Sequence, residues 1–152
     1  MRATRENLGF LLAKALQRWN ELLVTGFRRG GFAEVRAAYG SVLLPLFEED
    51  GLRLGELAAR SRLSKQAMTT LVRTMEDRRL IVRRADQADR RAARVFLTPR
   101  ARRFQATAEQ VLASLDRLVA QRLSRGQLTA FRNVMKTLMT LGDEPPRKGA
   151  VP

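Results

Sequence analysis

The fold of this chain is decided by residues 64–73, Ser64-Lys65-Gln66-Ala67-Met68-Thr69-Thr70-Leu71-Val72-Arg73, and by the stretch that follows them to residue 98. Apolar residues recur in the first stretch at helical spacing, and Ser64 is a favourable N-cap, so the pattern predicts a helix. Residues 80–84 and 92–97 predict two strands around the loop at residues 86–91. A helix followed by a basic hairpin is typical of a winged helix-turn-helix.

The flanking segments predict a mainly α-helical fold of one domain, residues 1–152. A winged helix-turn-helix at 52–98 would contain a short strand at 52–54, a helix at 55–60 and a small β-hairpin wing. Helical periodicity also predicts helices at 7–27, 32–49, from Pro99 onward, and from 124 to 141. Gly26, Gly30 and Gly31 are expected to break the first helix, and 142–152 to form a flexible tail. The acidic run at 48–50 is interpreted as a solvated helix end.

The terminal helices, at 7–31 and 99–141, carry broad apolar faces that a small helix-turn-helix core would not need. These long N- and C-terminal segments are therefore predicted to be dimerisation helices. The alternative is a monomer that folds them back on itself.

Charge favours a polyanionic partner. The chain carries 29 Lys and Arg against 15 Asp and Glu, and residues 73–103 hold eleven Arg and four acids. Such a surface attracts nucleic acid and releases counterions on binding. A merely solubilising surface is the alternative.

Several classes of function are disfavoured by what the sequence lacks. It has no Cys and no His, which removes thiol chemistry, the commonest general base and the commonest transition-metal ligand. No catalytic constellation, metal site or cofactor is predicted. No apolar run approaches the roughly 20 residues that span a bilayer, so we expect a cytoplasmic protein that does not associate with membranes.

The chain resembles the MarR family of bacterial transcription regulators (multiple-antibiotic-resistance regulators) from residue 7 to 141. Residues 54–58 are similar to the family's first helix-turn-helix helix, and 63–81 to its recognition helix. Residues 89–98, Asp89-Arg90-Arg91-Ala92-Ala93-Arg94-Val95-Phe96-Leu97-Thr98, fit its wing signature. Two positions depart from the family pattern. Arg79 stands where a left-handed Gly commonly ends the recognition helix, and Gln87 where Pro often follows the first wing Asp.

The resemblance implies a homodimer with one winged unit in each protomer. On the recognition helix, Gln66 would bond an adenine edge, Thr69 or Thr70 a thymine methyl, and Lys65 or Arg73 phosphate or guanine, the alternative being an ordinary solvated helix face. In the wing, three roles are open: minor-groove insertion, phosphate contact, or an ion pair with Asp86 or Asp89. The tip role falls to Arg91, oriented by Asp89, while Arg83 and Arg84 are expected at the DNA backbone or in solvent. The predicted DNA-binding set is Ser64, Lys65, Gln66, Thr69, Thr70, Arg73, Arg84, Arg90, Arg91 and Arg94.

Family members commonly bind small aromatic or phenolic compounds between the dimer helices and the winged unit. Four residues are candidates to line such a site here: Trp19, Phe32, Tyr39 and Phe47. Plain core packing is the alternative for each. A positive cleft would favour an anionic aromatic effector, such as a carboxylate or phenolate.

The sequence thus predicts a ligand-responsive homodimeric repressor that binds a pseudo-palindromic operator on double-stranded DNA. The alternative is a nucleoid-type architectural protein with little sequence preference. An enzyme is disfavoured because no nucleophile–base pair or metal cluster is apparent.

Overall fold

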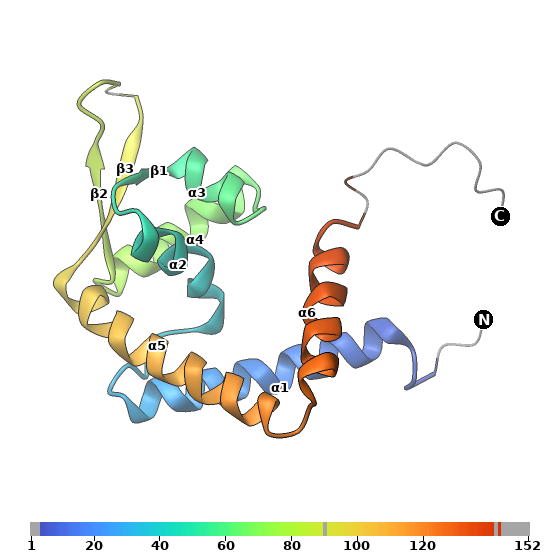
Figure 1. The fold of residues 1–152 in the computed structure, drawn as a ribbon. Helices are drawn as coiled ribbons and strands as arrows, with labels where there is room; N and C mark the ends of the chain where they lie inside the picture. The colour runs from blue at the N-terminus through green and yellow to red at the C-terminus, as the bar shows by residue number, and fades with distance from the viewer. Residues whose placement is uncertain (1–3, 90, 142, 144–152) are drawn as a thin grey trace, which may run out of the picture. The chain divides into compact units, whose positions relative to one another are not determined.

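The structure is a computed structural model that describes residues 4–89, 91–141 and 143. The chain forms two compact units, residues 1–112 and 113–152, and each is described by itself. None of the described helices is both long and apolar enough to cross a membrane. Along the chain (Figure 1) the elements are α1 (Leu8–Arg29), the 3-10 helix η1 (Ala37–Tyr39), α2 (Gly40–Glu48), β1 (Leu52–Arg53), α3 (Leu54–Arg60), α4 (Lys65–Asp77), β2 (Ile81–Ala85), β3 (Ala93–Leu97), α5 (Pro99–Ala120) and α6 (Arg125–Met139).

The winged helix-turn-helix is confirmed. Three antiparallel strands form a sheet in the order β1-β3-β2, in which Leu52 and Arg83 both pair with Val95. The hairpin of β2 and β3 projects beyond α3 and α4 (Figure 1). The helix α4 begins as predicted, because the Ser64 hydroxyl accepts a hydrogen bond from the Ala67 N–H at 3.1 Å.

One apolar core holds α4 against the sheet and α3. The stripe of α4 is buried at Met68, Val72 and Met75, while Leu71 is only half-buried. Burying an aliphatic side chain of this size stabilises a fold by roughly 1.5–3 kcal/mol, so this core fixes the direction of α4. The other buried side chains of this core are Leu52, Leu57, Leu80, Ile81 and Val95.

The first helix does not break at Gly26, and this prediction was wrong. It continues to Arg29. Gly26 instead allows α5 to approach closely, since a Cβ at this position would lie 2.6 Å from Cγ1 of Val111. A Cβ at Gly30 would likewise lie 2.3 Å from Cγ2 of Thr107. The chain turns only at Gly31, whose φ of +87° suits glycine.

The predicted helix at 32–49 begins later than expected. Residues 32–36 form a turn, in which the Phe32 N–H bonds the Phe27 carbonyl and the Val35 N–H bonds the Phe32 carbonyl. Helical structure starts with η1 and continues into α2, with Pro45 inside it.

The acidic run at 48–50 is more than a solvated helix end. Asp50 accepts a hydrogen bond from the Leu97 N–H at 2.9 Å and pairs with Arg102, and Glu49 pairs with Arg60. These contacts connect the segment after α2 to β3, α3 and α5.

The helices of the C-terminal part begin where the sequence predicts. Thr98 caps α5, since its hydroxyl accepts from the Ala101 N–H at 3.2 Å. Ser124 and Gln127 form the predicted capping box at the start of α6. No residue of α6 is buried. The tail predicted at 142–152 lies, apart from Asp143, outside the described residues.

Candidate DNA interface and an apolar cavity

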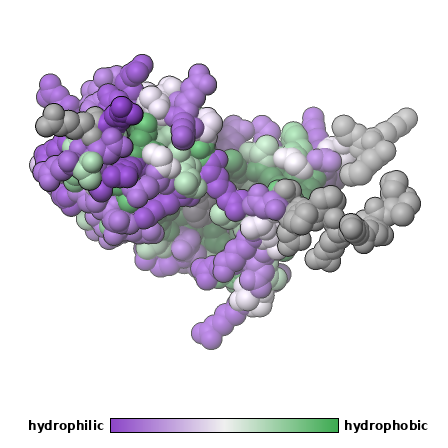
Figure 2. Space-filling model, turned by 90° about the horizontal axis from the view of Figure 1, so that it is seen from above, coloured by the Kyte–Doolittle hydropathy of each residue, from purple (hydrophilic) through white to green (hydrophobic). Residues whose placement is uncertain are grey.

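The polar face of α4 is uncovered. The structure places Ser64, Lys65, Gln66, Thr70 and Arg73 in exposed positions, and Thr69 in a half-buried one. Two hydroxyls bond carbonyls one turn earlier: Thr69 donates to the Lys65 carbonyl at 2.7 Å and Thr70 to the Gln66 carbonyl at 3.1 Å. Because both hydroxyls are engaged within α4, the predicted contact of these residues with DNA is that of a methyl group with a thymine methyl. Hydrophilic side chains cover most of the winged unit in the view from above (Figure 2).

The wing and the start of α4 share one groove. Arg91 lines it from the wing, and Lys65 and Thr69 line it from α4. With Arg53 and Glu56, which also line it, three cations, one hydroxyl and one carboxylate face this space, so positive charge exceeds negative charge there. Such an arrangement is suited to a nucleic-acid backbone or groove edge. Arg53, next to α3, lines the same groove and was not singled out by sequence reasoning. Arg90 lies outside the described residues.

Asp89 shapes the turn beside Arg91. Its carboxylate accepts a hydrogen bond from the Arg91 backbone N–H at 3.0 Å, and the Ala92 N–H bonds the Asp89 carbonyl at 2.9 Å. Asp89 therefore orients the backbone that carries Arg91. The Arg91 side chain is exposed.

A buried carboxylate, Asp86, holds the base of the wing. Its side chain is 2% exposed and accepts from Nε of Arg53 at 2.7 Å and from Nε of Arg94 at 2.9 Å. The Ala88 N–H also donates to it, at 2.8 Å. The hydrogen bond from Arg53, with those from the Ala88 N–H and Arg94, holds the pKa of the Asp86 carboxyl well below its usual range, so the group is ionised at neutral pH.

Of the three roles considered for the wing arginines, the structure gives Arg94 the ion pair with Asp86. Arg94 also donates from Nη1 to the Gly51 carbonyl at 2.9 Å. Arg53 of β1 and Arg94 of β3 thus meet at Asp86, the residue that follows β2. No local motif marks Arg53 as a partner of Asp86, because the two residues lie 33 positions apart in the chain.

The two arginines of β2 point to opposite faces. Arg83 pairs with Glu76 of α4, with Nη2 and Oε2 2.7 Å apart, and its backbone N–H donates to the same carboxylate at 3.1 Å. This contact lowers the pKa of Glu76. Arg84 lies over the ring of Phe96, 5.2 Å from the centroid, and is exposed. Arg83 thus fixes the wing to α4, and Arg84 is accessible to a partner.

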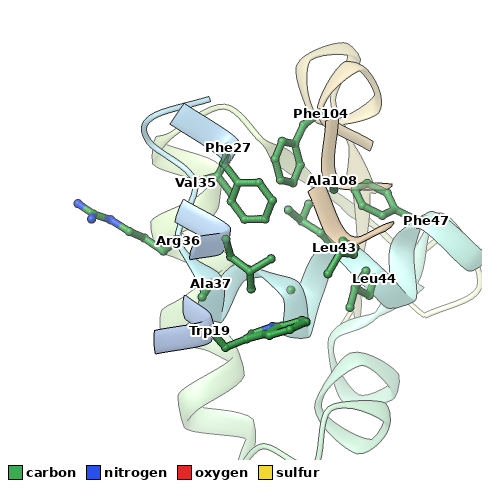
Figure 3. Close-up of a pocket in the computed structure, with 13 residues that line it drawn as sticks. Trp19, Phe27, Val35, Arg36, Ala37, Leu43, Leu44, Phe47, Phe104 and Ala108 are labelled. Atoms are coloured by element: carbon green, nitrogen blue, oxygen red, sulfur yellow. The ribbon is translucent and has the colours of Figure 1, made fainter. Parts of the chain in front are cut away.

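A cavity of about 190 Å³ lies between α1, η1, α2 and α5. Of the four predicted ligand-site residues, Trp19 and Phe47 line it (Figure 3). Phe32 instead packs edge-on against Phe104 with centroids 5.1 Å apart, and Tyr39 is buried in the core. The remaining lining residues are Leu23, Phe27, Val35, Arg36, Ala37, Gly40, Leu43, Leu44, Phe104, Ala108 and Leu112.

The cleft is not positive, so the condition for an anionic ligand is not met. Among the residues that the structure describes, Arg36 is the one charged residue that lines it, and in Figure 3 its side chain points away from the other lining residues. The other described lining residues are apolar or glycine.

The chain is similar in sequence and in fold to known transcriptional regulators. A family model described as the MarR family matches residues 41–92. An HTH-type transcriptional repressor of Mycobacterium tuberculosis is 32% identical over 93 residues, which cover 61% of this chain and 67% of the relative. The transcriptional repressor CouR, solved bound to a 23-mer DNA duplex, is 26% identical with a TM-score of 0.75, covering 91% of this chain and 99% of that one.

A further solved structure, the PcaV transcriptional regulator from Streptomyces coelicolor in complex with its natural ligand, has a TM-score of 0.77 at 19% identity. It covers 93% of this chain and 99% of that chain. This likeness concerns the fold.

Proposed function

Because the chain belongs to the MarR family of transcriptional regulators, we propose that it acts as a homodimeric repressor that binds a pseudo-palindromic operator and releases it when a small molecule binds. Members of this family are DNA-binding winged-helix regulators, and they are not enzymes. The observation that carries the proposal is the single groove lined by Lys65, Thr69 and Arg91.

In the proposed complex, α4 enters the major groove and the wing follows the adjacent minor groove. Gln66, Thr69 and Thr70 would contact base edges, with Lys65 and Arg73 at phosphate or guanine. The likeness to CouR, which was solved bound to a DNA duplex, supports the proposal that the chain binds DNA. Ser64, which is exposed at the start of α4, would join these contacts with DNA.

In the wing, Arg91 is proposed for the minor groove, where a narrow A·T-rich sequence has enhanced negative potential. Arg84 and Arg90 would both contact the sugar-phosphate backbone of the DNA. Arg94 would act mainly by holding the wing through Asp86, since its guanidinium already bonds that carboxylate.

Dimerisation is supported by apolar faces that lie uncovered in both units. On α1, the side chains of Leu8 and Leu16 are 58% and 59% exposed. On α6, Phe131 and Val134 are 48% and 51% exposed. Water-exposed apolar stripes of this length are typical of surfaces that bind another protein chain. The segments 7–31 and 99–141 are therefore proposed as the dimer contacts.

Dimerisation is tested with a matched pair of substitutions on α6. Phe131→Asp places a charge on the apolar face, and Asn133→Asp adds the same charge at an exposed polar position. Multi-angle light scattering should show a monomer for the first and a dimer for the second. A dimeric Phe131→Asp protein would refute these contacts.

The regulatory proposal is tested by competition between operator and random DNA. Footprinting next to the protein's own gene supplies the operator, and fluorescence anisotropy at several salt concentrations gives both affinities. We expect a steep salt dependence, about 0.9 log units per phosphate contact, and a preference for the operator of about 10³-fold or more. Equal affinities at physiological salt would favour the architectural alternative, which accounts for the positive net charge equally well.

The effector is proposed to be a small aromatic molecule, held where Trp19 and Phe47 line the cavity. Binding would favour a state in which the two recognition helices no longer match the operator half-sites. The cavity walls come from α1, α2 and α5, so a ligand that moves one of these helices changes the support of the winged unit.

A further inference from the structure

We propose that this cavity selects a neutral aromatic molecule of about one ring and rejects the corresponding anion. The inference deepens the effector part of the proposed function and rests on it only for the link between ligand and DNA. It follows from the walls of the cavity, from its volume and from the position of Arg36, the one charged residue among the described residues that line it.

Aromatic rings form much of the wall. Phe27 and Phe104 meet edge to face with centroids 4.9 Å apart, and Trp19 and Phe47 complete the ring-bearing sides (Figure 3). The volume of about 190 Å³ is close to the roughly 150 Å³ of an engineered apolar cavity that binds benzene. A monocyclic aromatic molecule with one small substituent therefore matches the space.

None of the described residues that line the cavity places a cation inside it to neutralise an anion. Arg36 is exposed and its side chain points away (Figure 3), so a carboxylate inside would lose water without gaining a cation. The Trp19 indole N–H, which bonds no other described residue, offers one donor to a neutral acceptor such as a nitro or carbonyl oxygen.

An aromatic acid would have to enter in its protonated form. An acid with a pKa of about 4 is about one part in a thousand protonated at pH 7. Its apparent affinity should then be up to about 1000-fold below that of a neutral molecule of the same shape, and should rise about tenfold for each pH unit of acidification. The sequence contains no His and no Cys, so no side chain with an ordinary pKa in the range of pH 5.5–7.5 would confuse this dependence.

The test uses two nearly isosteric probes, nitrobenzene and benzoate, with the full-length protein. Isothermal titration calorimetry between pH 5.5 and 7.5 should show nitrobenzene binding independent of pH. Benzoate should bind at least about 30-fold more weakly at pH 7, with the affinity rising on acidification as expected for binding of the neutral acid. Benzoate that binds as tightly as nitrobenzene, or independently of pH, would overturn the inference.

Two matched substitutions locate the site. Ala37→Leu would fill the cavity from η1 and should abolish nitrobenzene binding, whereas Ala38→Leu, at the exposed neighbouring position outside the cavity, should not. Equal binding by both variants would place the probe elsewhere and refute the inference. Thermal melts check that both variants fold.

A gain of function tests the charge argument. Leu44→Arg adds a cation at the exposed edge of the cavity and should strengthen benzoate binding about tenfold or more at pH 7. Arg36→Gln should leave benzoate binding unchanged. A loss of benzoate binding in Arg36→Gln would identify Arg36 as an anion site and overturn the inference.

The outcomes separate this inference from the proposed function. If neither probe binds, the cavity is only a packing space and the inference fails, while operator recognition is judged by its own competition assay. If nitrobenzene binds selectively but no operator is preferred over random DNA, the inference stands and the repressor function fails.

Discussion

Replacing Arg79 with glycine should stabilise the protein, because this residue ends α4 in the left-handed region with φ of +56°. A side chain with a Cβ costs about 1–2 kcal/mol in that conformation. Glycine removes this cost, but the greater conformational entropy that it gives the unfolded chain lowers the stability by about 0.5–1 kcal/mol. The expected net gain for Arg79→Gly is therefore about 0.5–1 kcal/mol, or about 1–4 °C in Tm.

The backbone contacts of Arg79 do not depend on its side chain. Its N–H bonds the Glu76 carbonyl at 2.8 Å, and its carbonyl accepts from the Thr98 hydroxyl at 2.8 Å. The side chain is exposed, so its loss should leave the native contacts intact.

Two control variants separate strain from charge. Arg79→Ala removes the guanidinium but keeps the Cβ, so its stability should stay within about 0.5 kcal/mol of wild type. Arg78→Gly makes the glycine change one residue earlier, where φ of −90° suits any residue, and should destabilise by about 0.5–1 kcal/mol. Urea unfolding at one fixed protein concentration gives all four free energies. An Arg79→Gly protein no more stable than Arg79→Ala would refute the strain argument.

Three further outcomes are expected. Arg91→Ala should weaken operator binding by about 1–3 kcal/mol in anisotropy titrations, and more than Arg84→Ala does; equal losses in folded proteins would contradict the tip assignment. The low pKa of Asp86 means that its ion pairs stabilise the fold above the carboxyl's ordinary pKa, and that this stability is lost as the pH falls through about 4 towards the lowered value. Asp86→Asn should therefore flatten the decline in unfolding free energy between pH 5 and pH 2, and an unchanged slope would argue against the assignment. Gly26→Ala should lower the Tm, because overpacking against α5 costs about 1–3 kcal/mol. Gly55→Ala should not, because no described atom outside its own stretch of α3 lies within 4 Å of the added Cβ.

Local signals in the sequence predicted most of the winged unit and the starts of α5 and α6. The caps at Ser64 and Thr98 and the capping box at Ser124 are contacts between residues three positions apart, so the residue types alone reveal them. The family resemblance added the left-handed position at Arg79, which the structure confirms.

The errors arise where distant segments decide the structure. Gly26 looks like a helix breaker until Val111 of α5 is placed against it. Phe32 and Tyr39 are aromatic like Trp19 and Phe47, and only the tertiary arrangement shows which pair lines the cavity.

Part of the positive charge of residues 73–103 is neutralised within the fold. Of the eleven arginines in residues 73–103, at least four bind carboxylates among the described residues: Arg83, Arg94, Arg100 and Arg102. Converting such a carboxylate to an amide would release a cation toward any polyanion while loosening the wing or α5. We therefore expect these carboxylates to increase the sequence specificity of DNA binding. Without them the protein should bind random DNA with higher affinity and prefer its operator less strongly.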